Sequence, residues 1–275
     1  MIKIHVAVPA SILLLSFSIP SAAQSFGNTN SRTAPRETLQ TPSDPSVITV
    51  RPELTDEQLA DLYMAHKEYR EAAQTFKRLT DENPRNPVYL NKLGIALHQQ
   101  AALDMALKYY ERATKVDPMY ADAQNNIGTI WYQRKKYGKA IKSYQKAIAI
   151  RKDMAVLYSN LGYAYFSDKK FAEAMTAFRQ TLVLDPQFFE HNGGRNGSVL
   201  QDRSVTNRGQ FYFMLAKSFA QVGNLERCVI YLRKAKDEGY ASMNSVKSDP
   251  DFAAMLASPA IQEILAPKQS EMVRR

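Results

Sequence analysis

The dominant feature of the sequence is an internal repeat with a period of 34 residues and no insertions between its four copies. In each copy an aliphatic residue is followed by a small one, and a second small residue and an aromatic follow at fixed offsets. A period of this length is typical of an array of supersecondary units rather than of one globular core. The aliphatic-small pairs are Leu59-Ala60, Leu93-Gly94, Ile127-Gly128 and Leu161-Gly162, the later small residues are Ala72, Ala106, Ala140 and Ala174, and the aromatics are Phe76, Tyr110, Tyr144 and Phe178.

Each copy contains two stretches with helical spacing, separated by a short turn. A two-helix unit cannot bury its apolar face alone, so neighbouring units must stack. We expect the small residues to let helices approach closely, and the aromatic to fill the space between one helix pair and the next. Proline closes three of the copies, but Lys152 takes its place in the third, which predicts a longer continuous helix there. Thr55-Asp56-Glu57-Gln58 has the form of a capping box at the first helix start.

Residues 53–188 resemble four consecutive tetratricopeptide repeats, because the small, aromatic and proline positions match that family's pattern. The resemblance implies an all-α fold, a right-handed α-solenoid of stacked helix-turn-helix units with C-terminal capping helices. A weaker fifth unit places Cys228 in a small-residue position, where we expect a buried side chain rather than a reactive thiol. The predicted units are 53–86, 87–120, 121–154, 155–188 and, for the degenerate fifth, 209–242.

The positions of glycine and proline predict two further segments, a loop and a C-terminal cap. Residues 189–208 contain three glycines and are predicted to form a loop, either a plain insertion or a lid; no strand precedes it and it lacks a phosphate-loop lysine. Residues 243–275 are predicted to be a C-terminal cap and tail, with helix starts at Asp249-Pro250 and Ser258-Pro259. A cap is expected because an open solenoid end exposes apolar surface.

The N-terminal residues have the pattern of a targeting segment. Residues 1–23 combine one lysine, a short apolar run and small residues before a cleavage site near Ala23-Gln24, which predicts a secretory signal peptide; an uncleaved anchor is the alternative. Residues 24–52 are rich in Ser, Thr and Pro and are predicted to be a disordered linker, as a spacer or with a docking motif. The mature chain is therefore expected to be extracytoplasmic, periplasmic or secreted, without a membrane span.

The resemblance implies that the first helices of the units line a concave groove. In some peptide-binding members, asparagines just before the aliphatic-glycine pair form a ladder along that groove, and an amide can pair with both the N–H and the C=O of an extended peptide. An asparagine can also occupy this position for structural reasons, and both interpretations stay open. The candidate groove residues are Asn91, Lys92, Asn125, Asn126, Tyr132, Asn160 and Tyr163.

The formal net charge of +9 is concentrated in one unit, 121–154, which holds eight basic and two acidic residues. The resemblance implies that second helices face outward, so this charge is expected on the convex side. It is interpreted as a solvated face or as a surface for an acidic partner; nucleic acid is not expected, because no aromatic stacking platform interleaves the charges. The candidate patch is Arg134, Lys135, Lys136, Lys139, Lys142 and Lys146.

Chemistry-bearing motifs are absent from the sequence. Its four histidines have no ligand-spaced partners, its single cysteine excludes an intramolecular disulfide, and no G-x-S-x-G, H-E-x-x-H or Walker motif occurs. We therefore expect no enzymatic activity, no metal and no cofactor. The sequence favours an exported scaffold that binds a protein or peptide partner in the groove; the alternative is a structural component of an envelope complex or homo-oligomer that uses the basic convex face.

Overall fold

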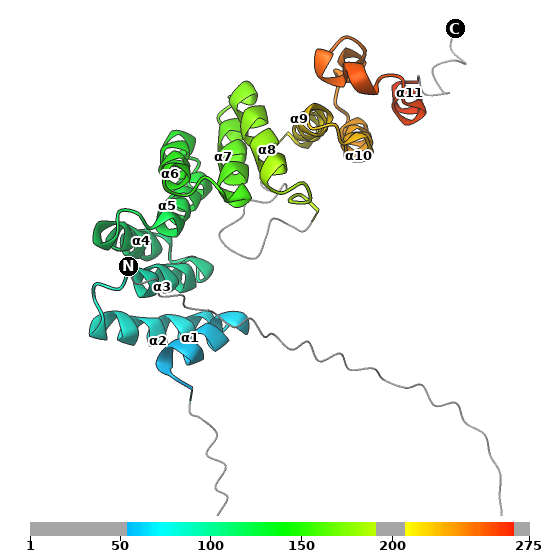
Figure 1. Cartoon of the computed structure of the whole chain (residues 1–275). Coiled ribbons are helices and arrows are strands. Elements are labelled where there is room, and N and C mark those ends of the chain that lie inside the picture. Colours follow the sequence, from blue (N-terminus) through cyan, green and yellow to red (C-terminus); the bar gives the residue numbers. More distant parts are fainter. Residues whose placement is uncertain (1–53, 191–206, 267–275) are drawn as a thin grey trace, which may run out of the picture. The chain divides into compact units, whose positions relative to one another are not determined.

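The computed structural model describes residues 54–190 and 207–266 (Figure 1). The predicted signal peptide, the predicted linker and most of the predicted loop 189–208 lie outside the described residues. In the described ranges every regular element is a helix, and consecutive helices pack as pairs, so the predicted all-α array is confirmed.

Five helix pairs follow one another along the chain. Each pair packs within itself, and its second helix packs on the first helix of the next pair. The pairs are α1 (Asp56–Ala65) with α2 (Tyr69–Glu82), α3 (Pro87–Gln99) with α4 (Leu103–Val116), α5 (Ala121–Gln133) with α6 (Tyr137–Ile150), α7 (Ala155–Ser167) with α8 (Phe171–Leu184), and α9 (Arg208–Gln221) with α10 (Leu225–Asp237). They are called units one to five below.

Two predictions about helix ends have opposite outcomes. The capping box is present: the Thr55 N–H donates to Gln58 Oε1 at 3.0 Å, and the Gln58 N–H donates to Thr55 Oγ1 at 3.2 Å. The continuous helix expected around Lys152 is wrong, because α6 ends at Ile150 and α7 begins at Ala155. Arg151 Nε donates to Asp153 Oδ1 at 3.0 Å within this link, so a local ion pair stabilises the break that proline makes in the other units.

The turn inside each unit contains one residue in the left-handed region. In four units this residue is not glycine, although its positive φ favours glycine. The turn still closes in the usual way for a helix end; in unit two, for example, the Ala102 N–H donates to Leu97 O at 3.0 Å. The residues are Lys67, Ala101, Lys135, Lys169 and Gly223, with φ of 62°, 60°, 55°, 61° and 77°.

The expected contact with the next helix pair is present for Phe178, whose ring centroid lies 5.7 Å from that of Phe211. In units two, three and four the aromatic also packs within its own unit. It lies against the glycine of its own unit: a Cβ added to Gly128 would stand 2.6 Å from Tyr144 Cε1. The same relation, at 2.5 Å, holds for Gly94 with Tyr110 and for Gly162 with Phe178. These three rings are fully buried. In units two, three and four the ring therefore fills the volume of the glycine's missing side chain, whereas unit one has Ala60 with Phe76 at the same two positions.

The hydroxyls of two equivalent tyrosines have different surroundings. Tyr144 Oη donates to Thr129 Oγ1 at 3.3 Å, whereas Ile95 occupies the Thr129 position in unit two. The buried hydroxyl of Tyr110 consequently has no hydrogen-bond partner among the described residues, and burial raises the pKa of Tyr110.

This difference predicts opposite effects of one substitution. Tyr110→Phe should raise the free energy of unfolding by about 1 kcal/mol, because it removes an unsatisfied buried hydroxyl. Tyr144→Phe should lower it by about 1 kcal/mol, because it leaves the Thr129 hydroxyl without that partner. Urea unfolding at pH 7 measures both values, and a change of the same sign in the two variants would contradict this account.

The fifth unit and the cap form one continuous apolar core. Cys228 is fully buried, and burial raises the pKa of its thiol to about 12, so it packs as the expected small residue. The cap consists of η2 (Met243–Lys247), η3 (Pro250–Met255) and α11 (Pro259–Leu265), with η3 packed on α9 and α11 on α10. Phe252 and Ile261 are fully buried in this contact.

A charged network joins α9 to η3. Lys217 Nζ lies 2.7 Å from Asp249 Oδ2 and 2.9 Å from Asp251 Oδ2, and Gln221 Nε2 donates to Asp251 Oδ1 at 2.9 Å. Burial alone would raise the pKa of Asp251, but the hydrogen bonds from Gln221 and Lys217 hold the pKa below its usual range.

The cap should therefore weaken in acid. A carboxyl whose pKa is lowered by folding stabilises the fold above its unfolded pKa, about 3.9, and this contribution is lost as the pH falls through the lower folded pKa. Lys217→Met should cost about 1–3 kcal/mol at pH 7 and reduce the difference between pH 7 and pH 3. Lys77→Met, which removes an exposed ion pair with Asp81, should change both values by only a few tenths of a kcal/mol. Urea midpoints at the two pH values test this, and equal effects of the two variants would contradict it.

Candidate functional site

The first helices of units two, three and four form one surface, which we call the first-helix face. α3 packs on α5 and α5 on α7. Side chains 35 residues apart meet across each junction on this face. Because the repeat is 34 residues long, a residue in one unit contacts the residue that stands one repeat position later in the next unit.

An inner row of polar pairs runs along this face. Asn126 Nδ2 donates to Asn91 Oδ1 at 2.9 Å, and Asn160 Nδ2 donates to Asn125 Oδ1 at 2.9 Å. At the same offset in the preceding junction, Lys92 Nζ donates to Glu57 Oε1 at 3.2 Å. Each junction between the first four units thus has one hydrogen-bonded pair in the same place.

The Lys92 pair belongs to a larger cluster. Lys92 Nζ also lies 2.7 Å from Asp61 Oδ2, and the Tyr89 hydroxyl donates to Glu57 Oε2 at 2.9 Å. The hydrogen bonds from Tyr89 and Lys92 hold the pKa of Glu57 below its usual range. Burial would lower the pKa of Lys92, but its bonds to Asp61 and Glu57 outweigh this and raise it. Lys92 therefore ties unit two to unit one.

The inner row differs from the exposed ladder that the sequence pattern suggested. The four asparagines are at most 4% exposed. Tyr132 and Tyr163, the other predicted groove residues, are also buried. The structure brings the predicted residues together on one face, but it places the asparagine amides in pairs between units, which corresponds to the structural interpretation of this position.

A second row lies seven residues further along the same helices. His98 Nε2 and Gln133 Oε1 are 3.0 Å apart, and the hydroxyls of Tyr132 and Ser167 are 2.9 Å apart. Burial lowers the pKa of His98. Gln133 and the equivalent Gln99 are exposed. The sequence-based prediction did not include Gln133 or Ser167. These two polar residues occupy the same repeat position, 34 residues apart, and this recurrence could have identified them.

The inner row ends at unit four. The buried hydroxyl of Ser159, in the position that accepts a hydrogen bond in the earlier units, has no partner among the described residues. Met214 stands at the donor position of unit five and cannot donate. Instead, Phe211 of α9 stacks on Tyr163 with ring centroids 5.3 Å apart, and contacts Phe166 at 5.5 Å. The fifth unit therefore joins the array through aromatic packing.

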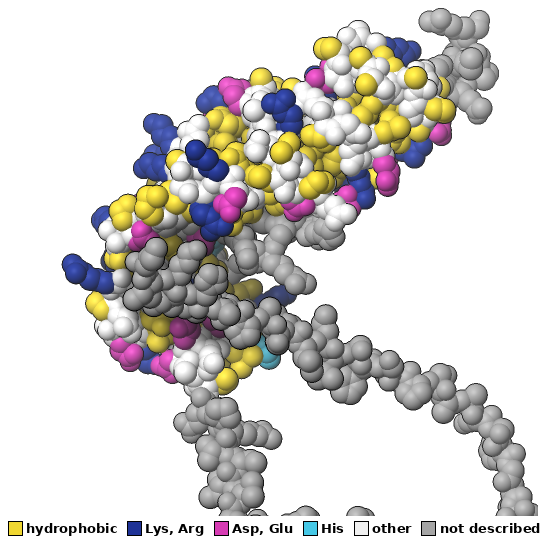
Figure 2. Space-filling view, viewed as in Figure 1, with side chains coloured by type: hydrophobic (Ala, Val, Ile, Leu, Met, Phe, Trp, Pro, Cys, Tyr) yellow, Lys and Arg dark blue, Asp and Glu magenta, His cyan; other side chains and the backbone are white. Residues whose placement is uncertain are grey.

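The predicted basic patch lies on α6 and in the turn that precedes it. Figure 2 shows basic side chains over the region of α6. Arg134 is different from the rest, because it forms an ion pair with Asp104 and lies over the Trp131 ring. Lys139 also lies over that ring, 4.3 Å from its centroid. The exposed members, none of which is in an ion pair within the described ranges, are Lys135, Lys136, Lys139, Lys142 and Lys146.

Family comparisons agree with this geometry. Two models described as tetratricopeptide repeat match residues 57–107 and 155–188, and one described as TPR repeat matches 128–169. Residues 57–107 and 128–188 therefore consist of tetratricopeptide repeats. The matches cover parts of units one to four, whose helices carry the two rows described above.

Several solved structures are similar to this tetratricopeptide array. A crystal structure of MamA is 20% identical over 68% of this chain and 97% of that chain, with a TM-score of 0.48. MamA from Desulfovibrio magneticus RS-1 is 16% identical over 70% and 96%, with a TM-score of 0.48. TTC0263, a thermophilic TPR protein of Thermus thermophilus, is 17% identical over 69% and 94%, with a TM-score of 0.47. No curated protein matches the chain.

The described part of the chain contains neither a cluster of metal-ligating side chains nor a helix that could span a membrane. In residues 54–190 and 207–266, no three His, Cys, Asp or Glu side chains are grouped as metal ligands. No helix in the same ranges is long and apolar enough to cross a membrane. Tetratricopeptide repeats are in general non-catalytic modules that bind proteins.

Proposed function

We propose that the chain is an exported, non-catalytic scaffold that binds an extended segment of a protein partner along its first-helix face. The observation that carries the proposal is the pair of polar rows on α3, α5 and α7. The inner row fixes the register of successive units, and the second row presents equivalent side chains at regular intervals. A surface with such a repeat suits an extended polypeptide, which can make similar contacts in successive units.

The contacts to the partner are assigned to exposed side chains rather than to the asparagines. The asparagine amides are buried in pairs, so a peptide could reach them only by breaking a junction between units. Gln99 and Gln133 are exposed beside them, and His98 and Ile95 are partly exposed. A variant of an asparagine should thus weaken partner capture only as far as it destabilises the fold.

Site-specific photo-crosslinking in the native host tests this assignment. A photo-reactive amino acid replaces Gln133 on the first-helix face or, as the matched control, Lys146 on the second-helix side. Mass spectrometry should find one partner segment crosslinked to position 133 and a much lower yield from position 146. Equal yields, or crosslinks from position 146 alone, would refute binding on the first-helix face.

Export is a separate part of the proposal and rests on the sequence of residues 1–23. Cell fractionation and N-terminal sequencing of the native protein test it together. The expected result is an extracytoplasmic protein that begins at Gln24. A cytoplasmic protein that still begins at Met1 would refute export and leave the binding surface untouched.

A second candidate function is assembly through the basic side. It is favoured by five exposed lysines, all within residues 135–146, that have no ion-pair partner in the described ranges. Replacing Lys135, Lys139 and Lys142 by Glu should reduce the native mass of the assembly in size-exclusion chromatography with light scattering. A chain that is monomeric in native extract and indifferent to these changes would rule the assembly function out.

A further inference from the structure

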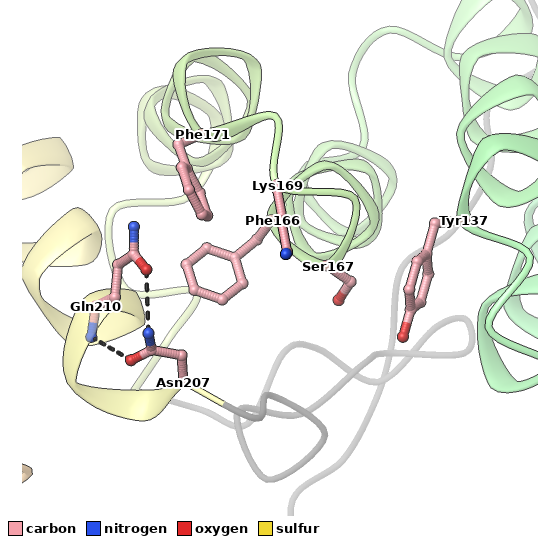
Figure 3. Close-up of a pocket in the computed structure, with 7 residues that line it drawn as sticks. All are labelled: Tyr137, Phe166, Ser167, Lys169, Phe171, Asn207 and Gln210. Atoms are coloured by element: carbon pink, nitrogen blue, oxygen red, sulfur yellow. Dashed lines mark hydrogen bonds between the residues drawn. The ribbon is translucent and has the colours of Figure 1, made fainter.

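A pocket with a volume of about 140 Å³ lies where units three, four and five meet (Figure 3). Its apolar wall consists of the rings of Tyr137, Phe166 and Phe171, and its polar lining includes Lys169, Asn207 and Gln210. In the view of Figure 3, Phe166 and Phe171 lie next to the Asn207–Gln210 pair, Tyr137 is on the other side, and the Lys169 ammonium lies between them.

The pocket exists because the fifth unit departs from the regular junction. Phe211 packs against Tyr163 and Phe166, which places the beginning of α9 beside the end of α7. The Phe166 and Phe171 rings, with centroids 5.4 Å apart, then face the first turn of α9. Unit three has an equivalent ring pair, Tyr132 and Tyr137, with centroids 5.4 Å apart, and the pocket combines the ring pair of unit four with the polar side chains of Asn207 and Gln210.

The volume of the pocket and its apolar, aromatic walls favour an aromatic group as the ligand. A cavity of about 150 Å³ with apolar walls is large enough for a benzene-sized ring. Aromatic rings pack well against other rings in edge or offset geometry. Tyr137 and Phe171 are partly exposed here. An incoming ring would remove their exposed apolar surface from water.

The polar groups of the pocket select negative charge. Lys169 carries the only charge among the lining residues, and it is in no ion pair within the described ranges. The neighbouring carboxylate of Asp168 is already paired with Lys170, 2.7 Å away. Asn207 and Gln210 bond to each other, since Asn207 Nδ2 donates to Gln210 Oε1 at 3.1 Å and Asn207 Oδ1 accepts from the Gln210 N–H at 3.1 Å. The lysine is therefore the charged group available to a ligand.

We propose that this pocket binds one aromatic side chain of the partner's extended segment, with an acidic residue next to it that pairs with Lys169. The inference rests on the proposed function and names the chemistry of its partner. The pocket lies at the C-terminal end of the first-helix face, so a bound segment is anchored there by the ring and the charge, and continues along α7 and α5.

Capped model peptides test this on the full chain. The probes are the acetylated, amidated hexapeptides Gly-Gly-Phe-Asp-Gly-Gly, Gly-Gly-Phe-Lys-Gly-Gly and Gly-Gly-Ala-Asp-Gly-Gly, titrated by ¹H–¹⁵N chemical-shift mapping. The Phe-Asp peptide should shift the amides of Ser167, Lys169, Phe171 and Gln210 and bind at least tenfold more tightly than the other two. Equal binding of all three, or shifts elsewhere only, would overturn the proposal.

A charge reversal with a matched control completes the test. Lys169→Glu should weaken the Phe-Asp peptide at least tenfold and make the Phe-Lys peptide the better ligand. Lys135→Glu is the control, because Lys135 has the same turn position and a similar φ in unit three but does not line the pocket. It should leave both affinities unchanged; an equal loss in the two variants would refute a specific role of Lys169. Crosslinking at position 133 tests the proposed function independently. Failure of the pocket proposal can therefore be distinguished from failure of the proposal that partners bind on the first-helix face.

Discussion

Gly128→Ala should lower the free energy of unfolding by about 2 kcal/mol, although alanine is the better helix former. The added Cβ would stand 2.6 Å from Cε1 of Tyr144, whose ring is fully buried among packed side chains. The clash must therefore be relieved by shifts in the helices themselves. Urea unfolding monitored by circular dichroism measures the loss.

Two further variants make this prediction specific. Gly138→Ala is the matched control, because a Cβ at this exposed helix position meets no atom within 4 Å, and it should stabilise by up to about 1 kcal/mol. Tyr144→Leu in the Gly128→Ala background should restore part of the loss. Unit five has this combination naturally, with Ala216 and Leu232 at the same two positions. A Gly128→Ala variant as stable as Gly138→Ala would show that the ring does not require the glycine.

Asn126→Ala should lower the free energy of unfolding by about 2 kcal/mol as well. The substitution removes the amide that donates to Asn91 Oδ1 and leaves a buried acceptor without this partner. It also removes one of the links that hold units two and three in register. Gln124→Ala on the same helix serves as the control and should change the stability by less than about 0.5 kcal/mol, because Gln124 is only partly buried. Urea unfolding of the two variants measures the difference, and equal losses would contradict a structural role for Asn126.

The array itself was predictable from the sequence because its signals are local or strictly periodic. The recurrence of Leu161-Gly162 and its equivalents gives the number and spacing of helix pairs. Thr55 and Gln58 mark a helix start within four residues. The buried Cys228 followed from its position in the fifth copy. Each of these inferences needs only the neighbouring residues and the repeat length.

The candidate site was less predictable because it depends on the register between units. The period of 34 gives equivalent positions, but the contacts across a junction have an offset of 35, so Asn126 meets Asn91 and not Lys92. The sequence therefore placed the asparagines on the first helices and could not decide between a binding and a structural role. The aromatic junction of unit five, and with it the pocket at Lys169, follows from the packing of Phe211, which no repeat pattern specifies.

The central claim is that the asparagine pairs hold the units together and that partners bind beside them. A double-mutant cycle across Asn91 and Asn126, with each residue changed to Ala singly and together and stability measured by urea unfolding, tests it most directly. The account predicts that the double variant loses less stability than the sum of the single variants, with a coupling of about 1 kcal/mol or more. Additive losses would contradict it, because they would mean that the two buried amides do not depend on each other.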